Sequence, residues 1–160
     1  MASIGFLCVR LAVAVVLFAH GAHTLFGAFA GPAIGPGGID QLTAHYVALG
    51  LQPALALAAL TGVVQVAGSL LLLIGWLARY AAAVNGLVVI LGIWREQAAW
   101  GFFLNWTGDP NRGHGVEYAI VLLAAMLLIV FAGAGDLSID GRKARRVAAR
   151  AAGRARLRMT

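Results

Sequence analysis

Four long apolar segments, separated by polar or glycine-rich connections, dominate the pattern of this chain of 160 residues. They cover about residues 4–26, 53–77, 80–94 and 116–132. Each approaches the ~20 residues that cross a hydrocarbon core of about 30 Å, and the third can extend in either direction. Backbone groups must be paired within such a core, so each segment is expected to be a helix. The pattern therefore predicts an all-α fold, a four-helix transmembrane bundle.

The three connections between these segments differ in character. The second is only a few residues long around Arg79, which predicts an antiparallel hairpin of the second and third segments. The first begins as a proline- and glycine-rich loop. It then places Leu42, Tyr46 and Leu49 at helical spacing, which predicts a short helix at the membrane interface. The third connection is crowded with aromatic residues, which are typical of the headgroup level: Trp94, Trp100, Phe102, Phe103 and Trp106.

Composition and charge support the membrane assignment and indicate an orientation. Charged residues make up 11% of the chain, against roughly 25% in soluble proteins. Eight of the twelve Lys and Arg residues lie beyond residue 140, and Arg79 lies in the second connection. Positive charge favours the cytoplasmic side. We therefore expect both termini in the cytoplasm, the two long connections outside, a membrane domain over residues 1–138 and a basic tail over residues 139–160.

The basic tail repeats arginine at every fourth residue. This spacing suits a basic helix on an anionic leaflet, where each charge contributes about 1 kcal/mol. A disordered tail that only sets the topology is the open alternative. Nucleic acid is not expected as a partner, because the tail is tethered to the membrane. The candidate membrane-surface residues are Arg142, Arg146, Arg150, Arg154 and Arg158.

Polar side chains within the apolar segments gather in the outer half of the predicted bundle. His20 and His23 are three residues apart and so share a helix face. Ionisable groups in a span cost roughly 2.5–3.5 kcal/mol and usually face the bundle interior or a cavity. Arg10 lies near the cytoplasmic end of its segment, from where its side chain is expected to reach the membrane surface. The candidate ligand-binding residues are His20, His23, Gln65, Glu117, Tyr118 and Trp106.

Several kinds of chemistry fit this polar cluster. The best ligand hypothesis is a quinone or another small apolar molecule, because imidazole exchanges protons near neutral pH. A hydrogen-bonded lock between the first and fourth segments, with no ligand, is the alternative. No metal is expected, since His-x-x-His lacks a third ligand of known geometry, and no haem, since only the first segment carries a histidine at depth. The single cysteine, Cys8, excludes disulfide and dithiol chemistry within the chain.

Short motifs follow one another in a fixed order along the chain: Arg10-Leu11, H-G-A-H-T-L-F-G-A-F, A-L-G-L-Q-P-A-L-A-L, A-G-S-L-L-L-L-I-G, G-F-F-L-N-W, G-V-E-Y and G-D-L-S-I-D. In order and spacing they resemble the DoxX family over about residues 4–140. The resemblance implies four transmembrane helices in a bacterial inner membrane. It also implies that four residues occupy positions of the family pattern: Arg10, His20, Glu117 and Tyr118.

The function that the resemblance implies is a role in a membrane redox complex. Members are similar to a subunit of a thiosulfate:quinone oxidoreductase, and others are associated with membrane oxidoreductase complexes. The chain departs from many members at Gln65, where they have glutamate, and at Trp94-Arg95, where they have histidine. Loss of both proton-active groups favours a scaffold or ligand-holding role. We therefore expect an accessory subunit that gives other subunits a packing surface and part of a quinone or lipid pocket.

Two other functions would place different demands on the sequence. A small intramembrane enzyme acting on a lipid-like substrate would use the histidines and Glu117 for proton transfer. A transporter would need polar residues through the whole bundle, but the fourth segment is wholly apolar below Tyr118. The enzyme is therefore the main alternative to the accessory subunit.

Overall fold

The computed structural model describes residues 2–31 and 35–157, and within these ranges it is helical, without a β-strand. Arg158, one of the candidate membrane-surface residues, lies outside the described residues. The helices are α1 (Ala2–Phe26), α2 (Ile39–Ala48), α3 (Ala54–Ile74), α4 (Ala78–Arg95), the 3-10 helix η1 (Gln97–Trp100), α5 (Glu117–Ala132) and α6 (Ile139–Leu157).

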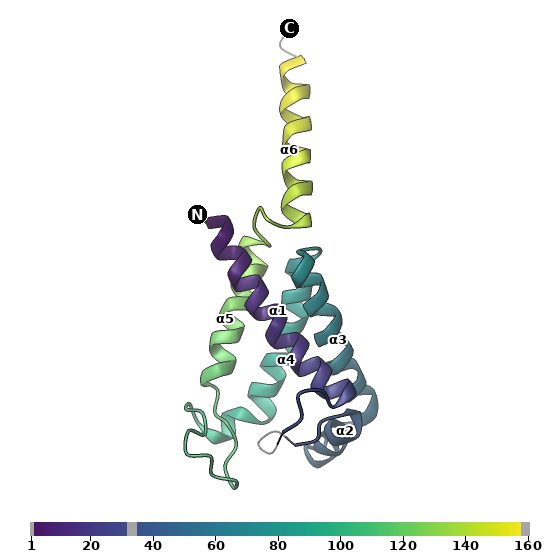
Figure 1. The fold of residues 1–160 in the computed structure, drawn as a ribbon, viewed down its shortest axis with the longest axis vertical. Coiled ribbons are helices and arrows are strands. Elements are labelled where there is room, and N and C mark those ends of the chain that lie inside the picture. The colour runs from purple at the N-terminus through teal and green to yellow at the C-terminus, as the bar shows by residue number, and fades with distance from the viewer. Residues whose placement is uncertain (1, 32–34, 158–160) are drawn as a thin grey trace.

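Four of these helices, α1, α3, α4 and α5, pack into one bundle (Figure 1). α1 packs against α3, α3 against α4, and α4 against α5. The predicted hairpin is therefore present, formed by α3 and α4, and the short helix predicted in the first connection is α2. α2 and the connection between α4 and α5 lie at one end of the bundle, whereas α1 and α6 both begin at the other.

Two of the bundle helices are long and apolar enough to cross a membrane. They are Ser3–Phe26 within α1 and Ala54–Ile74, which is α3. α5 is also apolar but has only 16 residues. α4 carries Arg79, Asn85 and Arg95 among its 18 residues. The helical fold and the two membrane-capable helices are thus confirmed, and the four spans stay a prediction.

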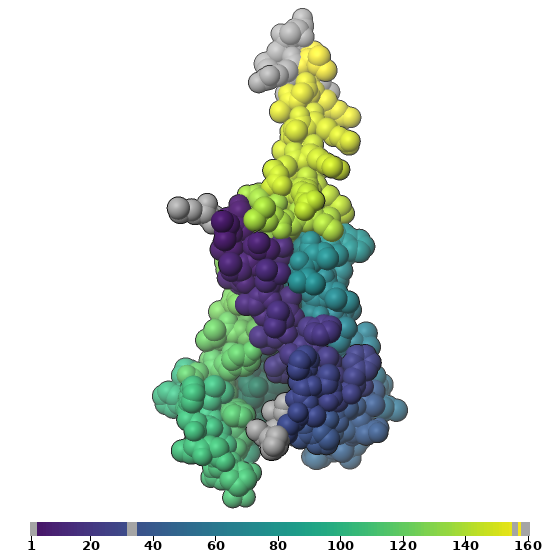
Figure 2. Space-filling model, in the orientation of Figure 1, coloured from purple at the N-terminus to yellow at the C-terminus, as the bar shows by residue number. Residues whose placement is uncertain are grey.

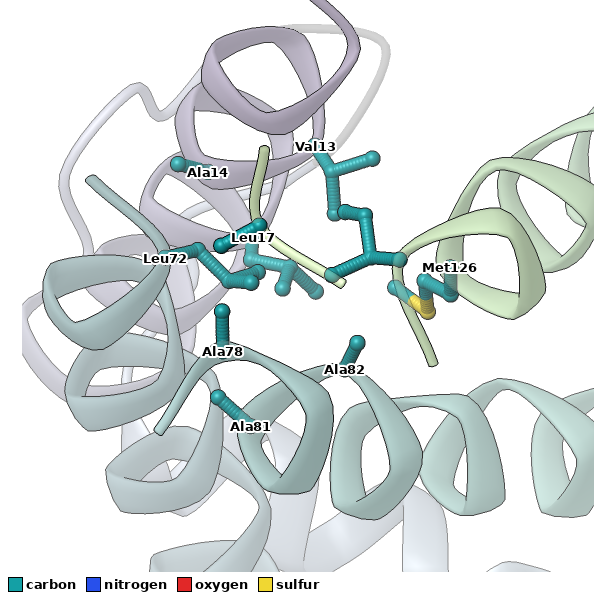
Figure 3. Packing of buried hydrophobic residues seen from close by; sticks show 10 residues of the cluster. Val13, Ala14, Leu17, Leu72, Ala78, Ala81, Ala82 and Met126 are labelled. Carbon is teal, nitrogen blue, oxygen red and sulfur yellow. The ribbon is translucent and has the colours of Figure 1, made fainter. Parts of the chain in front are cut away.

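The core of the bundle combines small residues with a few large ones. Leu17 of α1, Leu72 of α3 and Met126 of α5 surround the alanines of α4 (Figure 3). Alanine lets neighbouring helices approach closely. Many large apolar side chains are instead exposed on the outside, among them Val15, Leu60, Leu87, Val121 and Phe131. This distribution suits a bundle that is surrounded by lipid.

Arg10 does not lie where the sequence predicts. Its side chain is only 2% exposed rather than at the surface. Its Nη1 donates to the Ala134 carbonyl at 2.7 Å, and its Nη2 donates to the Leu137 carbonyl at 2.9 Å. A buried guanidinium needs such acceptors. The predicted surface position is wrong because the connection after α5 folds back over the start of α1.

The first turn of α6 also contacts the start of α4. The Asp140 carboxylate accepts hydrogen bonds from the Leu77 and Ala78 backbone N–H groups, at 3.2 and 3.0 Å. A carboxylate at this position satisfies free backbone donors and complements the helix dipole. Ser138 caps α6 in turn, because its hydroxyl accepts from the Gly141 N–H at 2.9 Å.

The basic tail is a helix in the residues that the structure describes, which decides between the two alternatives for its conformation. α6 extends away from the bundle and does not lie across its end (Figures 1 and 2). Its repeated arginines are exposed: Arg142, Arg146, Arg150 and Arg154. Contact between this face and a membrane surface stays a prediction.

Candidate functional site

A cavity of about 480 Å³ lies at the end of the bundle that carries α2. All five helices from α1 to α5 contribute to its wall. Much of the lining is apolar, including Leu17, Leu42, Leu57, Val89 and Leu122. Cavities of roughly 300–1,000 Å³ with mainly apolar walls are typical of small-molecule sites. This cavity is therefore the candidate site.

The structure brings four of the six predicted ligand-binding residues to this cavity: His20, His23, Gln65 and Tyr118. The two histidines come from α1, the glutamine from α3 and the tyrosine from α5. Three different helices thus direct polar groups into one mainly apolar space. A few convergent polar groups of this kind fix the orientation of a bound molecule.

The two histidines of the cavity share one hydrogen-bonding arrangement. Nδ1 of His20 lies 2.9 Å from the Val16 carbonyl oxygen, and Nδ1 of His23 lies 3.0 Å from the Ala28 carbonyl oxygen. A carbonyl oxygen only accepts, so each Nδ1 carries the hydrogen and donates. In the neutral ring Nε2 is then an acceptor. Each histidine can therefore accept a proton or a hydrogen bond at Nε2.

Gln65 contributes a polar atom without a partner. Its Oε1 is buried and accepts no hydrogen bond within the residues that the structure describes. Leaving a buried acceptor unsatisfied costs about 1–3 kcal/mol. A donor supplied by a molecule in the cavity would remove this cost.

Glu117 and Trp106 are not part of the cavity wall. Oε2 of Glu117 instead accepts a hydrogen bond from the Leu104 backbone N–H at 3.1 Å. The carboxylate thereby binds the third connection to the start of α5. Trp106 is 76% exposed on that connection. The third connection therefore does not cover the site as a whole. Only Glu96 and Gln97 at its beginning, next to Trp94 of α4, contribute to the wall.

Part of the cavity wall is formed by α2, which was not predicted to belong to the site. His45 and Tyr46 of α2 both line the cavity. The Tyr46 hydroxyl is hydrogen-bonded to the Thr61 hydroxyl of α3 at 3.0 Å. The Arg95 guanidinium at the end of α4 donates to the Leu49 carbonyl just after α2. These contacts hold α2 over the bundle.

His45 also contacts a carboxylate at the edge of the cavity. Its Nε2 lies 3.2 Å from Oε2 of Glu96, and both side chains are partly exposed. A signal for His45 was present in the sequence, because it lies three residues after Leu42 and four before Leu49, on the predicted apolar face of α2. No comparable signal exists for Glu96, which follows α4 and meets His45 only through the fold.

Comparison with known proteins gives one match. The sequence profile of the DoxX family matches residues 5–106, which is well over half of the chain. The matched range contains α1 to α4 and thus most of the cavity wall, but neither α5 nor α6. No curated protein and no solved structure matches the chain. The chain belongs to the DoxX family, a family of membrane-associated proteins.

Proposed function

We propose that this protein is an integral membrane subunit of a quinone-linked redox complex and holds a quinone-class molecule in the cavity. The observation that carries the proposal is the mainly apolar cavity of about 480 Å³ with His20, His23, Tyr118 and the unpartnered Gln65 oxygen at its wall. Family resemblance to membrane oxidoreductase subunits supports the choice of ligand class.

The proposed position in the membrane has α1, α3, α4 and α5 spanning a bacterial inner membrane. At 1.5 Å per residue, the 16 residues of α5 extend about 24 Å and the 18 of α4 about 27 Å, close to the hydrocarbon thickness. Arg79 and the basic face of α6 lie at the end where α1 begins. The positive-inside rule assigns this end to the cytoplasm. The cavity then opens in the outer half of the membrane.

The polar groups of the cavity suit both redox forms of a quinone. A quinone carbonyl accepts from a donor such as the Tyr118 hydroxyl. A quinol hydroxyl donates to an acceptor such as Nε2 of His20 or His23, or the Gln65 oxygen. The free Nε2 of either imidazole can then take up the proton that a quinol releases. We assign electron transfer itself to a partner subunit.

The experiment that tests ligand binding is a titration of the purified full chain with decylubiquinone. Trp94 lines the cavity, so a bound quinone is expected to quench its fluorescence. Gly92 also lines the cavity, and a side chain added there meets no atom within 4 Å. Gly92→Leu should fill the space and abolish saturable quenching, whereas Gly92→Ala is the matched control and should bind normally. Equal binding by both variants and the wild type would place the quinone elsewhere.

The subunit role is tested separately by native mass spectrometry after gentle extraction from the source membrane. Other polypeptides in a fixed ratio to this chain are expected. A chain that is recovered alone would contradict the subunit role and favour the alternative, an intramembrane enzyme with a lipid-like substrate. The contacts of Glu117 give that enzyme no support, because its carboxylate binds the Leu104 N–H outside the cavity.

A further inference from the structure

A second cavity, of about 420 Å³, lies at the opposite end of the bundle, where α6 begins. Its wall consists of the start of α4, the connection that follows α5, and the first turns of α6. None of these residues belongs to the cavity proposed for the quinone. The second cavity is therefore a separate site.

Among the charged residues of this cavity wall, one arginine makes no hydrogen bond or ion pair within the described residues. Three charged residues line it: Arg79, Asp136 and Asp140. The Asp140 carboxylate already accepts two backbone N–H groups at the start of α4. Asp136 is paired with Arg145 at 2.9 Å. Arg79 has no hydrogen bond or ion pair within the described residues, so its guanidinium is available to an anion.

The Arg79 guanidinium lies against the backbone that follows α5. A side chain at Gly133 would come within 3.3 Å of Nε and Nη2 of Arg79. Gly133 also has a φ of +88°, which strongly favours glycine. The absence of a side chain at this position leaves room for the guanidinium beside the cavity.

The height of the cavity relative to the proposed membrane indicates which anion it meets. α4 begins at Ala78 and α5 ends at Ala132, so the cavity lies where two proposed spans reach the membrane surface. Tyr80 is 72% exposed and Phe131 76% exposed beside it. Exposed aromatic side chains close to an unpartnered guanidinium match the two parts of a phospholipid, its chains and its phosphate.

We propose that this cavity binds the phosphate of a phospholipid headgroup in the cytoplasmic leaflet, with Arg79 as the residue that contacts the phosphate. The proposal goes beyond quinone binding and shares with it only the membrane position of the helices. Failure of decylubiquinone to bind would leave this inference intact, because the two cavities have no residue in common.

The test is native mass spectrometry of the detergent-purified full chain titrated with dioleoyl phosphatidic acid. Arg79→Gln is expected to weaken binding about fivefold, which corresponds to the ~1 kcal/mol of one basic residue near a charged headgroup. Ala144→Trp should also weaken binding, because residue 144 lines the cavity and is exposed on α6. Arg112→Gln is the matched control on the opposite end of the molecule and should bind as the wild type does.

Two further probes distinguish the source of the phosphate. Dioleoylglycerol has the same chains without a phosphate and is expected not to bind at this site. Inorganic phosphate is expected to compete poorly, because it lacks the chains. Wild-type affinity in Arg79→Gln, equal binding of dioleoylglycerol, or full competition by inorganic phosphate would each overturn the proposal. Helical content by circular dichroism confirms that each variant is folded.

Discussion

Asn85 shows how one buried polar side chain sets the packing of two helices. It is 1% exposed, and its Nδ2 donates to the Ala81 carbonyl in α4 at 2.9 Å and to the Val64 carbonyl in α3 at 3.3 Å. Gly68 of α3 lies against this amide, and a side chain there would overlap it. The amide reaches the backbone of α3 because residue 68 has no side chain.

Gly68→Ala is therefore expected to lower the free energy of unfolding by about 1–3 kcal/mol, since overpacking displaces a hydrogen-bonded amide. Gly92→Ala is the matched control in α4, where a side chain meets no atom within 4 Å. That variant should gain up to ~1 kcal/mol from helix propensity. Thermal unfolding in one detergent should shift in opposite directions for the two variants. A shift in the same direction would contradict the packing described for Asn85.

Individual site residues differ in how far the sequence could place them. His20 and His23 follow from local helical spacing, and Gln65 and Tyr118 from their depth in a span. Glu117 has a similar depth, yet its carboxylate binds the Leu104 N–H, because the third connection folds back on the start of α5. The position of a residue along a helix predicts how deep its side chain lies in the bundle. It does not predict whether a nearby loop will bind that side chain.

Among the elements, α2 forms part of the wall of the candidate cavity and is attached by few contacts. None of its residues is buried. Its attachment therefore depends on a few polar contacts, including the Tyr46–Thr61 hydrogen bond and the His45–Glu96 pair. Glycines with positive φ flank it on both sides, Gly38 at +91° and Gly50 at +71°. A short helix held in this way separates from the bundle more readily than its neighbours.

Tyr46→Phe tests this attachment, because it removes one hydroxyl and leaves the ring. Loss of a hydrogen bond of about 1 kcal/mol should speed hydrogen exchange in residues 39–48 roughly fivefold. Tyr80→Phe is the control, since Tyr80 is exposed and makes no side-chain hydrogen bond within the described residues. Unchanged exchange in α2 of Tyr46→Phe would mean that the other contacts suffice.

Elements were more predictable from the sequence than their roles. The lengths of the apolar segments predict the four bundle helices, and the spacing of Leu42, Tyr46 and Leu49 predicts α2. That α2 walls the cavity could not be predicted, because its partners Thr61 and Glu96 are distant in sequence. Pairs of this kind arise only when the helices assemble.

For the whole molecule, the connection between α5 and α6 determines how the tail is attached. Asp136 accepts a hydrogen bond from the Ser3 hydroxyl at 2.7 Å and pairs with Arg145 of α6. The hydrogen bond from Ser3 and the interaction with Arg145 lower the pKa of the Asp136 carboxyl below its ordinary value. The ionised form is thus favoured when α6 is attached as the structure shows.

The sign of the pH dependence follows from this lowered pKa. The stabilising contribution of Asp136 is present above the ordinary pKa of 3.8 and is lost as pH falls through the lowered value. A spin label at Lys143 should therefore become more mobile only below about pH 4. Asp136→Asn should lack this acid transition, so that the label is equally mobile above and below pH 4. A transition retained in Asp136→Asn would assign it to another carboxylate.

The overall arrangement was only partly accessible from the sequence. Charge and apolar length predicted that α1 and α6 begin at one end. Nothing local indicated that residues 134 and 137 would receive the Arg10 guanidinium, because that contact joins positions 124 and 127 residues apart. A contact between residues so far apart in the sequence depends on the path of the connection after α5, which the amino-acid composition does not reveal.

This contact between the two ends of the chain has a consequence for biogenesis. During synthesis the guanidinium of Arg10 emerges first, while the carbonyls that bind it belong to Ala134 and Leu137. The carboxylate that caps α4 arrives later still, at Asp140. Until residues 134 to 140 have left the ribosome, the Arg10 guanidinium lacks these acceptors and the start of α4 lacks this cap. Chains that end before residue 140 would therefore lack the cap of α4, and a complete set of contacts at this end of the bundle requires the first turn of α6.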